Sequence, residues 1–551
     1  MPPSFSPSYR ATSLVGAALH ARVFGRIGLL NNLRHWKENS AGIQLAQLRN
    51  LLHTARNTVF GKQHNFERIS QTDDADLLNA YRAEVPVVDW YASKDLIARM
   101  REGAEPDVLW PGLVKDFAQT SGTTAGDKYI PVSSQMMKSN YLASLDIFAN
   151  IHRFGCSLEK LLAGKSLFLG GSTKLDTSDK GIKTGDLSGI VTPLIKWPLT
   201  EIYLPGPDIA LMSHWPSKID AMAKRCLDED VRMVSGMCSW QLVLFEKVMQ
   251  LARERGKDVK NIRDVWPNFH VLVHGGVKYA PFDPRMRNAY SGSPEGADIP
   301  CRVELYPASE GFVAIQDVKG DPGLRLNVDM FNYFEFVSLE EINDASPRAF
   351  SCWDVEKNQK YVVVLSTCAG MWRYVLGDVV EFDTIPDKPL HLGGGGGEGP
   401  CRLRIVGRHR HFINAFGENL IVEHIENAVA AASKAANVTI GEFSAAPVYP
   451  KDGVRAGLEL AVEVQQLPMS ADALGRFRDN FDASLKAQNV DYTTKRTDGF
   501  GMDAPTITPL PIGTFHKWME SRGKLGGQHK CPRCANNRDI IEGVKSVNNL
   551  S

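Results

Sequence analysis

The sequence lacks several features that would each assign it to a broad class. No apolar run approaches the roughly 20 residues that a membrane-spanning helix requires. Neither sign of charge dominates, because 63 basic residues balance 63 acidic ones. No internal repeat is present. We therefore expect neither a nucleic-acid partner nor a membrane partner, since the total charge favours binding neither to a nucleic acid nor to an anionic membrane.

Cysteine is too sparse and too scattered to form a disulfide framework. The nine cysteines are an odd number spread over 551 residues, which is typical of reduced thiols in a cytosol-like compartment.

Residues 1–37 contain five Lys or Arg residues and no acidic one. An organelle transit peptide can have this composition, but a flexible start followed by an amphipathic helix is favoured. The sequence therefore predicts a cytoplasmic protein.

Helical and extended patterns alternate along the whole chain. Its 551 residues predict two to four domains, at roughly 100–200 residues each. Apolar spacing predicts helices at 41–56, 216–228, 239–254 and 470–487, and short apolar runs stopped by glycines predict strands at 166–171 and 269–276. Further strands are expected within 302–316, 333–342, 360–367 and 457–465. This mixture predicts an α/β (mixed α+β) fold.

The character of the chain changes near Gly407. A strand there gives way to a basic turn, a Gly-Glu turn and a long amphipathic helix that ends near residue 432. The boundaries that we predict are a flexible N-terminal segment at 1–40, a large domain at 41–406, a hinge at 407–414 and a small C-terminal α/β domain at 415–551.

The stretch TSGTTAGDKYIPVS, residues 120–133, resembles a phosphate loop but is not a Walker loop. Its two glycines, Gly122 and Gly126, are separated by three residues rather than four, and Asp127 precedes Lys128. Glycines still let backbone N–H groups surround an anion, and hydroxyls add donors. Lys128 can offer a point charge to phosphate. An ordinary polar turn before a strand explains the stretch equally well.

Two further stretches carry side chains suited to a nucleotide. In YPASEG, residues 306–311, an aromatic ring can stack on a base and Glu310 can bind Mg²⁺. In WRYVLGDVVEF, residues 372–382, Asp378 can accept two hydrogen bonds from a ribose diol. Each stretch taken alone also fits a structural turn.

Taken together and in this order, the stretches resemble the adenylate-forming superfamily, and more narrowly its GH3 branch of acyl acid–amido synthetases. The residues that match the family's three motifs are Thr120, Ser121, Gly122, Thr123 and Thr124, then Tyr306, Ser309 and Glu310, then Tyr374, Gly377 and Asp378. Similarity extends over nearly the whole chain, for example in WPNFHVLVHGG at 266–276 and QHKCPR at 528–533. The GENL turn at 417–420 is more similar to microbial members than to plant ones.

The resemblance implies a fold and a reaction. A large N-terminal domain would carry a small C-terminal domain that rotates over the active site. ATP and a carboxylic acid would form an acyl-AMP and pyrophosphate, and an amine, usually that of an amino acid, would then release AMP and form an amide. The implied cofactors are ATP and Mg²⁺, and the implied partners are a small carboxylic acid and an amine.

The resemblance also implies a set of site residues. Residues 120–124 and Lys128 would hold the phosphates, and Glu310 would hold Mg²⁺. The nucleotide would further contact Gly275, Gly276, Tyr306, Ser309, Arg373 and Asp378. Arg408 and Lys530 would be delivered by rotation of the small domain. Trp240, His274 and Tyr279 either line the acyl pocket or belong to the core.

One position departs from the family pattern. Val375 stands where an Arg is expected in the third motif. Arg373 lies two residues earlier, and on a strand it would share the face of residue 375. We therefore expect Arg373 to replace the missing side chain.

Two alternatives to an amide ligase stay open. The acyl-AMP could pass to an alcohol, giving an ester, or to coenzyme A, giving a thioester, although no basic pocket for the coenzyme's phosphate is visible. A degenerate member that only binds a nucleotide or an acid is the third interpretation. The intact Thr123, Glu310 and Asp378 oppose it, whereas Val375 leaves it open.

Overall fold

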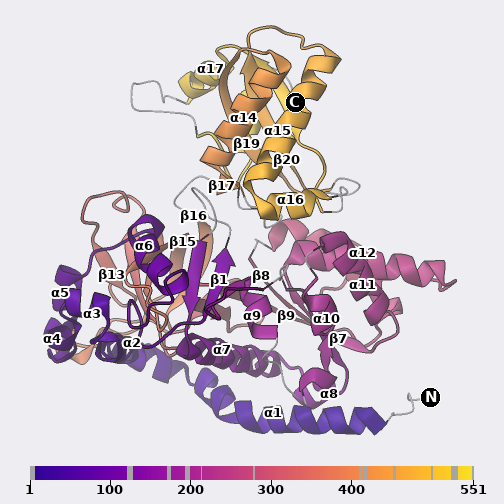
Figure 1. Cartoon of the computed structure of the whole chain (residues 1–551). Helices are drawn as coiled ribbons and strands as arrows, with labels where there is room; N and C mark the ends of the chain where they lie inside the picture. The colour runs from indigo at the N-terminus through magenta and orange to yellow at the C-terminus, as the bar shows by residue number, and fades with distance from the viewer. Residues whose placement is uncertain are drawn as a thin grey trace.

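The computed structural model describes residues 7–120, 128–170, 175–192, 199–212, 214–276, 279–408, 412–413, 418, 420–450, 455–497, 501–522 and 532–548. These residues form a larger and a smaller body, both of mixed helix and sheet (Figure 1). The chain passes from one to the other where strand β16 (Arg402–Arg408) ends. The mixed α/β class predicted from the sequence is confirmed.

A twelve-stranded sheet forms the core of the larger body. Its order is β13-β12-β14-β15-β16-β11-β10-β9-β8-β7-β3-β6. The strands from β6 to β9 run parallel, and those from β9 to β13 pair antiparallel. Their bounds are β3 (Lys165–Phe168), β6 (Tyr203–Leu204), β7 (Val231–Gly236), β8 (Val271–Gly275), β9 (Cys301–Pro307), β10 (Phe312–Gln316), β11 (Leu324–Leu326), β12 (Tyr333–Ser338), β13 (Ala349–Ser351), β14 (Tyr361–Ser366) and β15 (Tyr374–Thr384).

Helices cover both faces of the parallel half of this sheet. Val271 and Val273 of β8 pack in one core with α1 (Pro7–Asn31) and α7 (Ser134–Arg153). Leu272 packs on the other face, in a core with α11 (Trp215–Cys226), α12 (Cys238–Glu254) and α13 (Asp283–Ser291). A parallel strand buried on both faces is apolar at nearly every position, which explains the run of apolar residues before His274.

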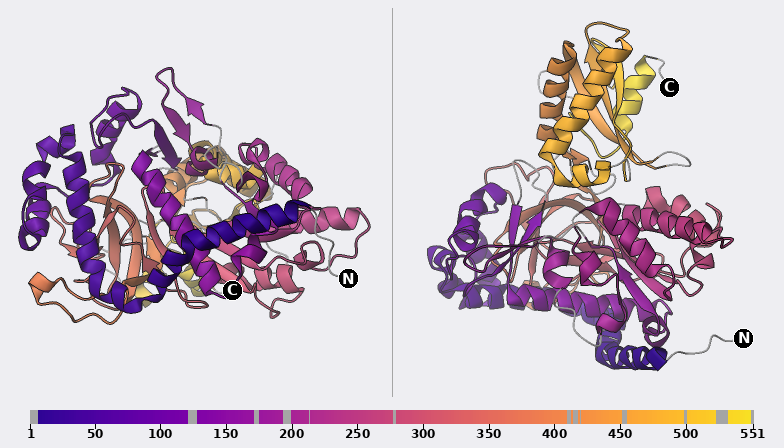
Figure 2. Two further views of the ribbon diagram at one scale, coloured as in Figure 1. Left: turned by 90° about the horizontal axis from the view of Figure 1, so that it is seen from below. Right: turned by 45° about the vertical axis from the view of Figure 1, so that its right-hand side comes forward.

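Helix α1 lies across the underside of the larger body (Figure 2). Its Arg26 pairs with Asp146 of α7 and with Asp329, both at 2.6 Å. Helix α2 (Leu33–Ala55) follows, and the side chain of Asn32 caps it by accepting from the N–H of His35. From Pro7 onward, the segment expected to be flexible over 1–40 is therefore helical and attached to the body. Of the helices described, none has the length and apolar character needed to cross a membrane.

A second sheet holds the hairpin that resembles a phosphate loop. Its order is β2-β1-β5-β4, with bounds β1 (Asp116–Thr120), β2 (Lys128–Val132), β4 (Asp176–Thr177) and β5 (Lys183–Gly185). Two helices pack against this sheet, α6 (Trp90–Arg101) on β2 and α9 (Leu187–Val191) on β1. The other short helices of the larger body are α3 (Val59–Gln63), α4 (Phe66–Ser70), α5 (Asp74–Glu84), α8 (Leu158–Leu162) and α10 (Pro207–Ala210).

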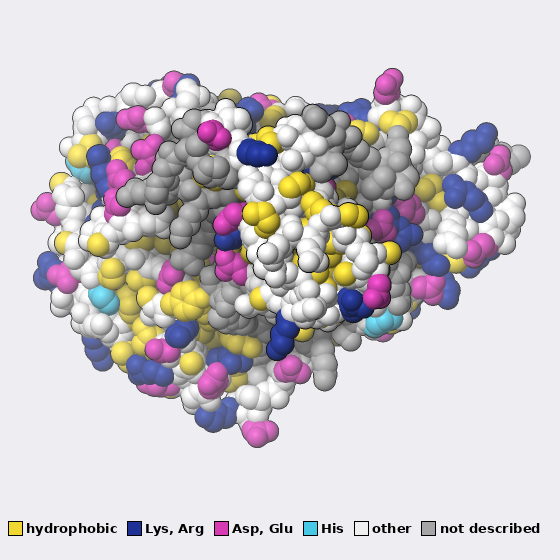
Figure 3. Space-filling view, turned by 90° about the horizontal axis from the view of Figure 1, so that it is seen from above, with side chains coloured by type: hydrophobic (Ala, Val, Ile, Leu, Met, Phe, Trp, Pro, Cys, Tyr) yellow, Lys and Arg dark blue, Asp and Glu magenta, His cyan; other side chains and the backbone are white. Residues whose placement is uncertain are grey.

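The smaller body stands above the larger one in Figure 1 and in the right-hand view of Figure 2. Its sheet has the order β19-β20-β21, beside a two-stranded ribbon of β17 and β18. The element bounds are β17 (Phe412–Ile413), β18 (Leu420–Ile421), α14 (Val422–Ala436), β19 (Ile440–Val448), β20 (Gly457–Val464), α15 (Ala471–Gln488), α16 (Val490–Arg496), β21 (Thr506–Pro511), α17 (Thr514–Ser521) and α18 (Asp539–Val547). Seen from above, acidic and basic side chains are interspersed over the visible face (Figure 3).

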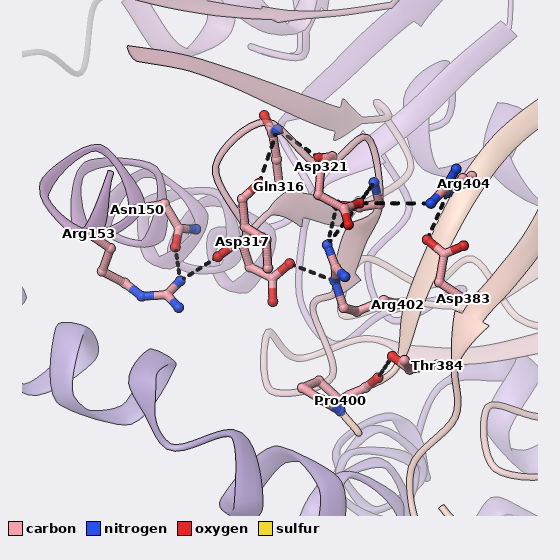
Figure 4. Close-up of polar contacts among 12 residues, drawn as sticks. Asn150, Arg153, Gln316, Asp317, Asp321, Asp383, Thr384, Pro400, Arg402 and Arg404 are labelled. Atoms are coloured by element: carbon pink, nitrogen blue, oxygen red, sulfur yellow. Dashed lines mark hydrogen bonds and ion pairs between the residues drawn. The ribbon is translucent and has the colours of Figure 1, made fainter. Parts of the chain in front are cut away.

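A polar network fixes the turn between β10 and β11 against β16 (Figure 4). Arg402 of β16 donates to Asp317 at 2.9 Å and pairs with Asp321 at 3.3 Å. Gln316 donates to the carbonyl of Asp321 at 2.8 Å and accepts from the N–H of Glu304 on β9 at 2.8 Å. The network therefore joins β16 to β9 through the strands between them.

Candidate active site

The carboxyl ends of the parallel strands form one edge of the large sheet. Ligands of open α/β sheets bind outside this edge, and β7, β8 and β9 end there at Gly236, Gly275 and Pro307. A Cβ at Gly275 would lie 2.6 Å from the carbonyl oxygen of Leu305, and Gly276 has a φ of +83°. Only glycine fits both demands, so the backbone itself lines this part of the edge.

The hairpin of β1 and β2 reaches the start of β15. Thr120 pairs with Lys128 at the last rung of the ladder before the connecting residues, and Lys128 donates to the hydroxyl of buried Tyr374 at 3.4 Å. The first and third motifs therefore lie side by side. Ser121, Gly122, Thr123 and Thr124 lie outside the described residues, so their part in the site stays a prediction.

Tyr306 and Asp378 join the second motif to the third. The Tyr306 hydroxyl donates to a carboxylate oxygen of Asp378 at 2.7 Å, although 72 residues separate the two. Both side chains are largely buried. Gly377, with a φ of +96°, provides the bend that precedes Asp378. An aromatic face and a carboxylate held together in this way fit a nucleoside.

Glu310 and Ser309 occupy the turn between β9 and β10. Glu310 is buried, Ser309 is half-buried, and the turn closes through a bond of 3.2 Å from the N–H of Gly311 to the carbonyl of Ala308. Within the described residues, no three His, Cys, Asp or Glu side chains are close enough to share a metal ion. One carboxylate still fits Mg²⁺, which keeps several waters and shares phosphate oxygens.

The position of Arg373 corrects a prediction. Its Nε donates to Glu335 at 2.8 Å and its Nη1 donates to the carbonyl of Val85 at 2.7 Å. Its Nη2 also contacts Glu335, at 3.3 Å. Because every guanidinium nitrogen has a protein acceptor and the side chain is 4% exposed, Arg373 supports the strand from inside the body rather than facing a nucleotide. The residue precedes β15 and has a φ of +42°, so the strand alternation assumed for it does not apply.

Val375 sits in an apolar environment. It pairs with Val364 of β14 and packs beside Val337, and its N–H donates to the carbonyl of Val88 at 2.8 Å. The neighbours of position 375 therefore suit the valine that is present.

The residues expected to move with the smaller body are only partly described. Arg408 closes β16, where its backbone pairs with Asp378 of β15. Within the predicted hinge, residues 407–408 end β16 and residues 412–413 form β17. Lys530 lies outside the described residues.

Two polar residues of the sheet escaped the sequence reasoning. Arg302 and Glu304 lie four and two residues before Tyr306 on β9, and both are half-buried. Charged residues at every second position of a strand in a covered sheet are unusual. That alternation was the available signal.

Sequence models of the GH3 family match most of the chain. The N-terminal domain of the family matches residues 29–205 and 202–295, its central domain matches 326–390, and its C-terminal domain matches 423–539. Among curated proteins, an indole-3-acetic acid-amido synthetase of Oryza sativa subsp. indica is 23% identical, over 96% of this chain and 95% of its own. A jasmonoyl–L-amino acid synthetase of Nicotiana attenuata is 23% identical, over 65% of this chain and 68% of its own.

Solved structures show the same fold. A GH3.15 acyl acid amido synthetase in complex with 2,4-DB superposes with a TM-score of 0.56 at 17% identity, over 99% of this chain and 97% of its own. A 2-hydroxyisobutyryl-CoA ligase in its thioesterification state superposes with a TM-score of 0.50 at 15% identity, over 93% and 92% of the two chains.

Proposed function

The chain belongs to the GH3 family, and on this premise we propose that it is an ATP-dependent ligase that joins a carboxylic acid to an amine. In the first half-reaction the acid's carboxylate attacks the α-phosphorus of ATP, giving acyl-AMP and pyrophosphate. In the second, the amine attacks the acyl carbon, giving the amide and AMP, and one proton is released.

The observation that carries this proposal is the bond of 2.7 Å between Tyr306 and Asp378. It joins two motifs that are distant in sequence at the edge where a nucleotide would bind. The Asp378 carboxylate would accept hydrogen bonds from the ribose diol, and the ring of Tyr306 would stack on the adenine.

The phosphates would lie between the hairpin and the β9–β10 turn. Lys128, Thr120, Ser121, Gly122, Thr123 and Thr124 would donate to the phosphate oxygens, and Ser309 would lie beside them. Gly275 and Gly276 would let the backbone approach the nucleotide. Glu310 would hold Mg²⁺, which supplies charge neutralisation at the phosphate oxygens when bound. Preorganised donors of this kind stabilise charge that develops during attack.

The second half-reaction would require movement of the smaller body. We propose that residues 415–551 rotate about 407–414 as a small domain against the large domain at 41–406, and that this motion brings Arg408 and Lys530 to the acyl-AMP. An amino acid is the proposed acceptor, supported by curated relatives whose names describe amido and amino-acid synthetases. The cytoplasm is the proposed compartment, supported by eight buried cysteines that are all free thiols in the described part of the chain.

ATP–pyrophosphate exchange with a panel of carboxylic acids tests the proposal. Exchange that depends on the acid is expected. Its absence with every acid would leave only a binding role. Mass spectrometry of reactions supplied with amino acids, alcohols or coenzyme A would then identify the product, and an ester or a thioester in place of an amide would overturn the proposed acceptor.

A further inference from the structure

A group of polar side chains lies where the sheet should be apolar. In the parallel ladder, His274 of β8 pairs with Glu304 of β9, and Leu272 pairs with Arg302. Paired residues of neighbouring strands point to the same face, and Leu272 packs on the face covered by α12 and α13. Together with Gln241 of α12 and Tyr279, these residues form what we name the β8–β9 polar cluster: Gln241, His274, Tyr279, Arg302 and Glu304.

Ring contacts hold the cluster together. The ring centroids of His274 and Tyr279 lie 4.7 Å apart. The guanidinium carbon of Arg302 lies 3.9 Å from the centroid of the same Tyr279 ring. Gln241 reaches the cluster by donating to the carbonyl of Val273 at 3.0 Å, and Gln316 fixes the backbone of Glu304 from the next strand.

Several polar atoms of the cluster have no hydrogen-bond partner. They are Nδ1 and Nε2 of His274, the hydroxyl of Tyr279, Nε of Arg302 and Oε1 of Gln241. His274 is 1% exposed and Tyr279 is 7% exposed, so bulk water does not replace the missing partners. Buried polar atoms are nearly always hydrogen-bonded, and five unpaired atoms in one place indicate a site built for a polar ligand.

The charges of the cluster favour a neutral ligand group. Burial and the neighbouring Arg302 lower the pKa of His274 to about 3, so its imidazole is neutral and offers one donor and one acceptor. The Nη2 of Arg302 lies 3.4 Å from a carboxylate oxygen of Asp298, so the positive charge of Arg302 already has an acidic partner. Glu304 lies beside His274 in the ladder, and burial raises the pKa of its carboxyl to about 7, so near neutral pH this group is partly protonated and can donate as well as accept a hydrogen bond. A hydroxyl, which both donates and accepts, matches this set.

The cluster lies directly below the edge that would hold the reacting carboxylate. His274 immediately precedes Gly275 and Gly276, and Glu304 lies two residues before Tyr306. A substrate whose carboxylate reaches the nucleotide at this edge would extend its tail toward the covered face. Resting on the proposed function, we infer that the β8–β9 polar cluster binds a hydroxyl or keto oxygen on the tail of the carboxylic acid substrate, so that the enzyme selects oxygen-substituted acids over plain hydrocarbon acids.

Matched pairs of acids test this inference in the full-length protein. The probes are hexanoic and 6-hydroxyhexanoic acid, 5-oxohexanoic acid, and 3-phenylpropanoic and 3-(4-hydroxyphenyl)propanoic acid. The readout is kcat/KM in ATP–pyrophosphate exchange. A site built to hydrogen-bond a substrate oxygen rejects the analogue that lacks it by large factors, so we expect a preference of about a hundredfold or more for the oxygenated member of at least one pair.

Two substitutions and a matched control assign the preference to the cluster. Tyr279→Phe removes one hydroxyl and His274→Leu removes both ring nitrogens, and each should reduce the preference at least about tenfold. Tyr290→Phe is the control, because Tyr290 lies on α13 with its ring against Phe269, at 5.9 Å between centroids, outside the cluster. It should leave the preference unchanged.

Each result decides the inference. If kcat/KM for every plain acid equalled or exceeded that of its oxygenated partner, the inference would be overturned while the ligase function stood. The cluster would then hold only ordered water. An unchanged preference in both cluster variants would overturn it too. If none of the acids supported ATP–pyrophosphate exchange, the ligase function would be overturned, and this inference with it. Melting temperatures check folding: Tyr279→Phe should not melt below the wild type, because the lost hydroxyl has no protein partner.

Discussion

The hydroxyl of Tyr306 lies 2.7 Å from a carboxylate oxygen of Asp378 and donates a hydrogen bond to it, across 72 residues of sequence. Tyr306 is the penultimate residue of β9, the last strand of the parallel half of the large sheet, whereas Asp378 belongs to β15, in the antiparallel half. The bond therefore ties together the two halves of the sheet at the edge where we place the nucleotide.

Replacing Asp378 should weaken ATP use. Asp378→Asn keeps the shape but loses the charge, and hydrogen bonds to a charged acceptor contribute about 1.5–3 kcal/mol. We expect kcat/KM for ATP in the exchange assay to fall about ten- to a hundredfold. Tyr306→Phe keeps the ring and should cost less than about tenfold. Tyr361→Phe is the control, since the hydroxyl of Tyr361 on β14 accepts from the N–H of Glu356 and its ring packs against Phe350 and Phe382. A normal KM for ATP in Asp378→Asn would contradict the assigned role.

Replacing Glu310 should change the dependence on magnesium. Glu310→Gln removes the anionic oxygen ligand from the β9–β10 turn, so half-maximal exchange should require at least about tenfold more Mg²⁺. Glu340→Gln, at an exposed position after β12, is the matched control. If both variants showed the wild-type Mg²⁺ titration, Glu310 would not be the metal ligand.

Glu335 should make the stability depend on acid pH. Burial alone would raise the pKa of Glu335, but Arg373 and Arg82 lower it below its usual value. The stabilisation from its ionised form is therefore fully present above the unfolded-state pKa of about 4.3 and is lost as the pH falls through the lower folded-state pKa. Glu335→Gln leaves two arginines without their partner, so it should lower the free energy of unfolding at pH 7 by about 3–5 kcal/mol.

Denaturant unfolding at pH 7 and at acid pH measures this effect. The difference between wild type and Glu335→Gln should shrink as the pH falls below about 4. Glu105→Gln is the control, because Glu105 pairs with Arg99 at an exposed position and should change the stability little. A difference that stays constant with pH would mean that the charge of Glu335 does not matter.

Gly275 should tolerate no side chain. The added Cβ in Gly275→Ala would lie 2.6 Å from the carbonyl oxygen of Leu305, so β8 and β9 must separate. We expect a loss of about 1–3 kcal/mol in the free energy of unfolding, together with slower exchange. Gly475→Ala, where nothing lies within 4 Å of the new Cβ in α15, should instead stabilise the protein by up to about 1 kcal/mol. Equal melting temperatures for the two variants would refute the steric argument.

Local pattern predicted the elements well where the pattern was strong. The helix predicted at 239–254 is α12 (Cys238–Glu254), and the strand predicted at 269–276 is β8 (Val271–Gly275). Periodic apolar residues and terminal glycines identify such elements because the signal lies within a few residues.

Contacts between distant segments left no such signal. Arg26 donates a hydrogen bond to Asp146, 120 residues away in the sequence, and Arg373 donates one to Glu335, 38 residues away. The first contact attaches a helix that was expected to be flexible, and the second removes Arg373 from the nucleotide site. The motif residues Tyr306 and Asp378 could be named from the sequence, but their bond depends on how the sheet folds.

The ladder between β15 and β16 has a rung at which Asp378 pairs with Arg408. One side of this rung is the proposed ribose ligand, and the other is the point where the chain leaves for the smaller body. A strand cannot slip by one residue without turning its side chains to the opposite face, so the pairing of Asp378 with Arg408 keeps a fixed register. In the proposed cycle, a rotation of the smaller body that displaces Arg408 would also displace the backbone of Asp378. The release of AMP would then be coupled to that rotation.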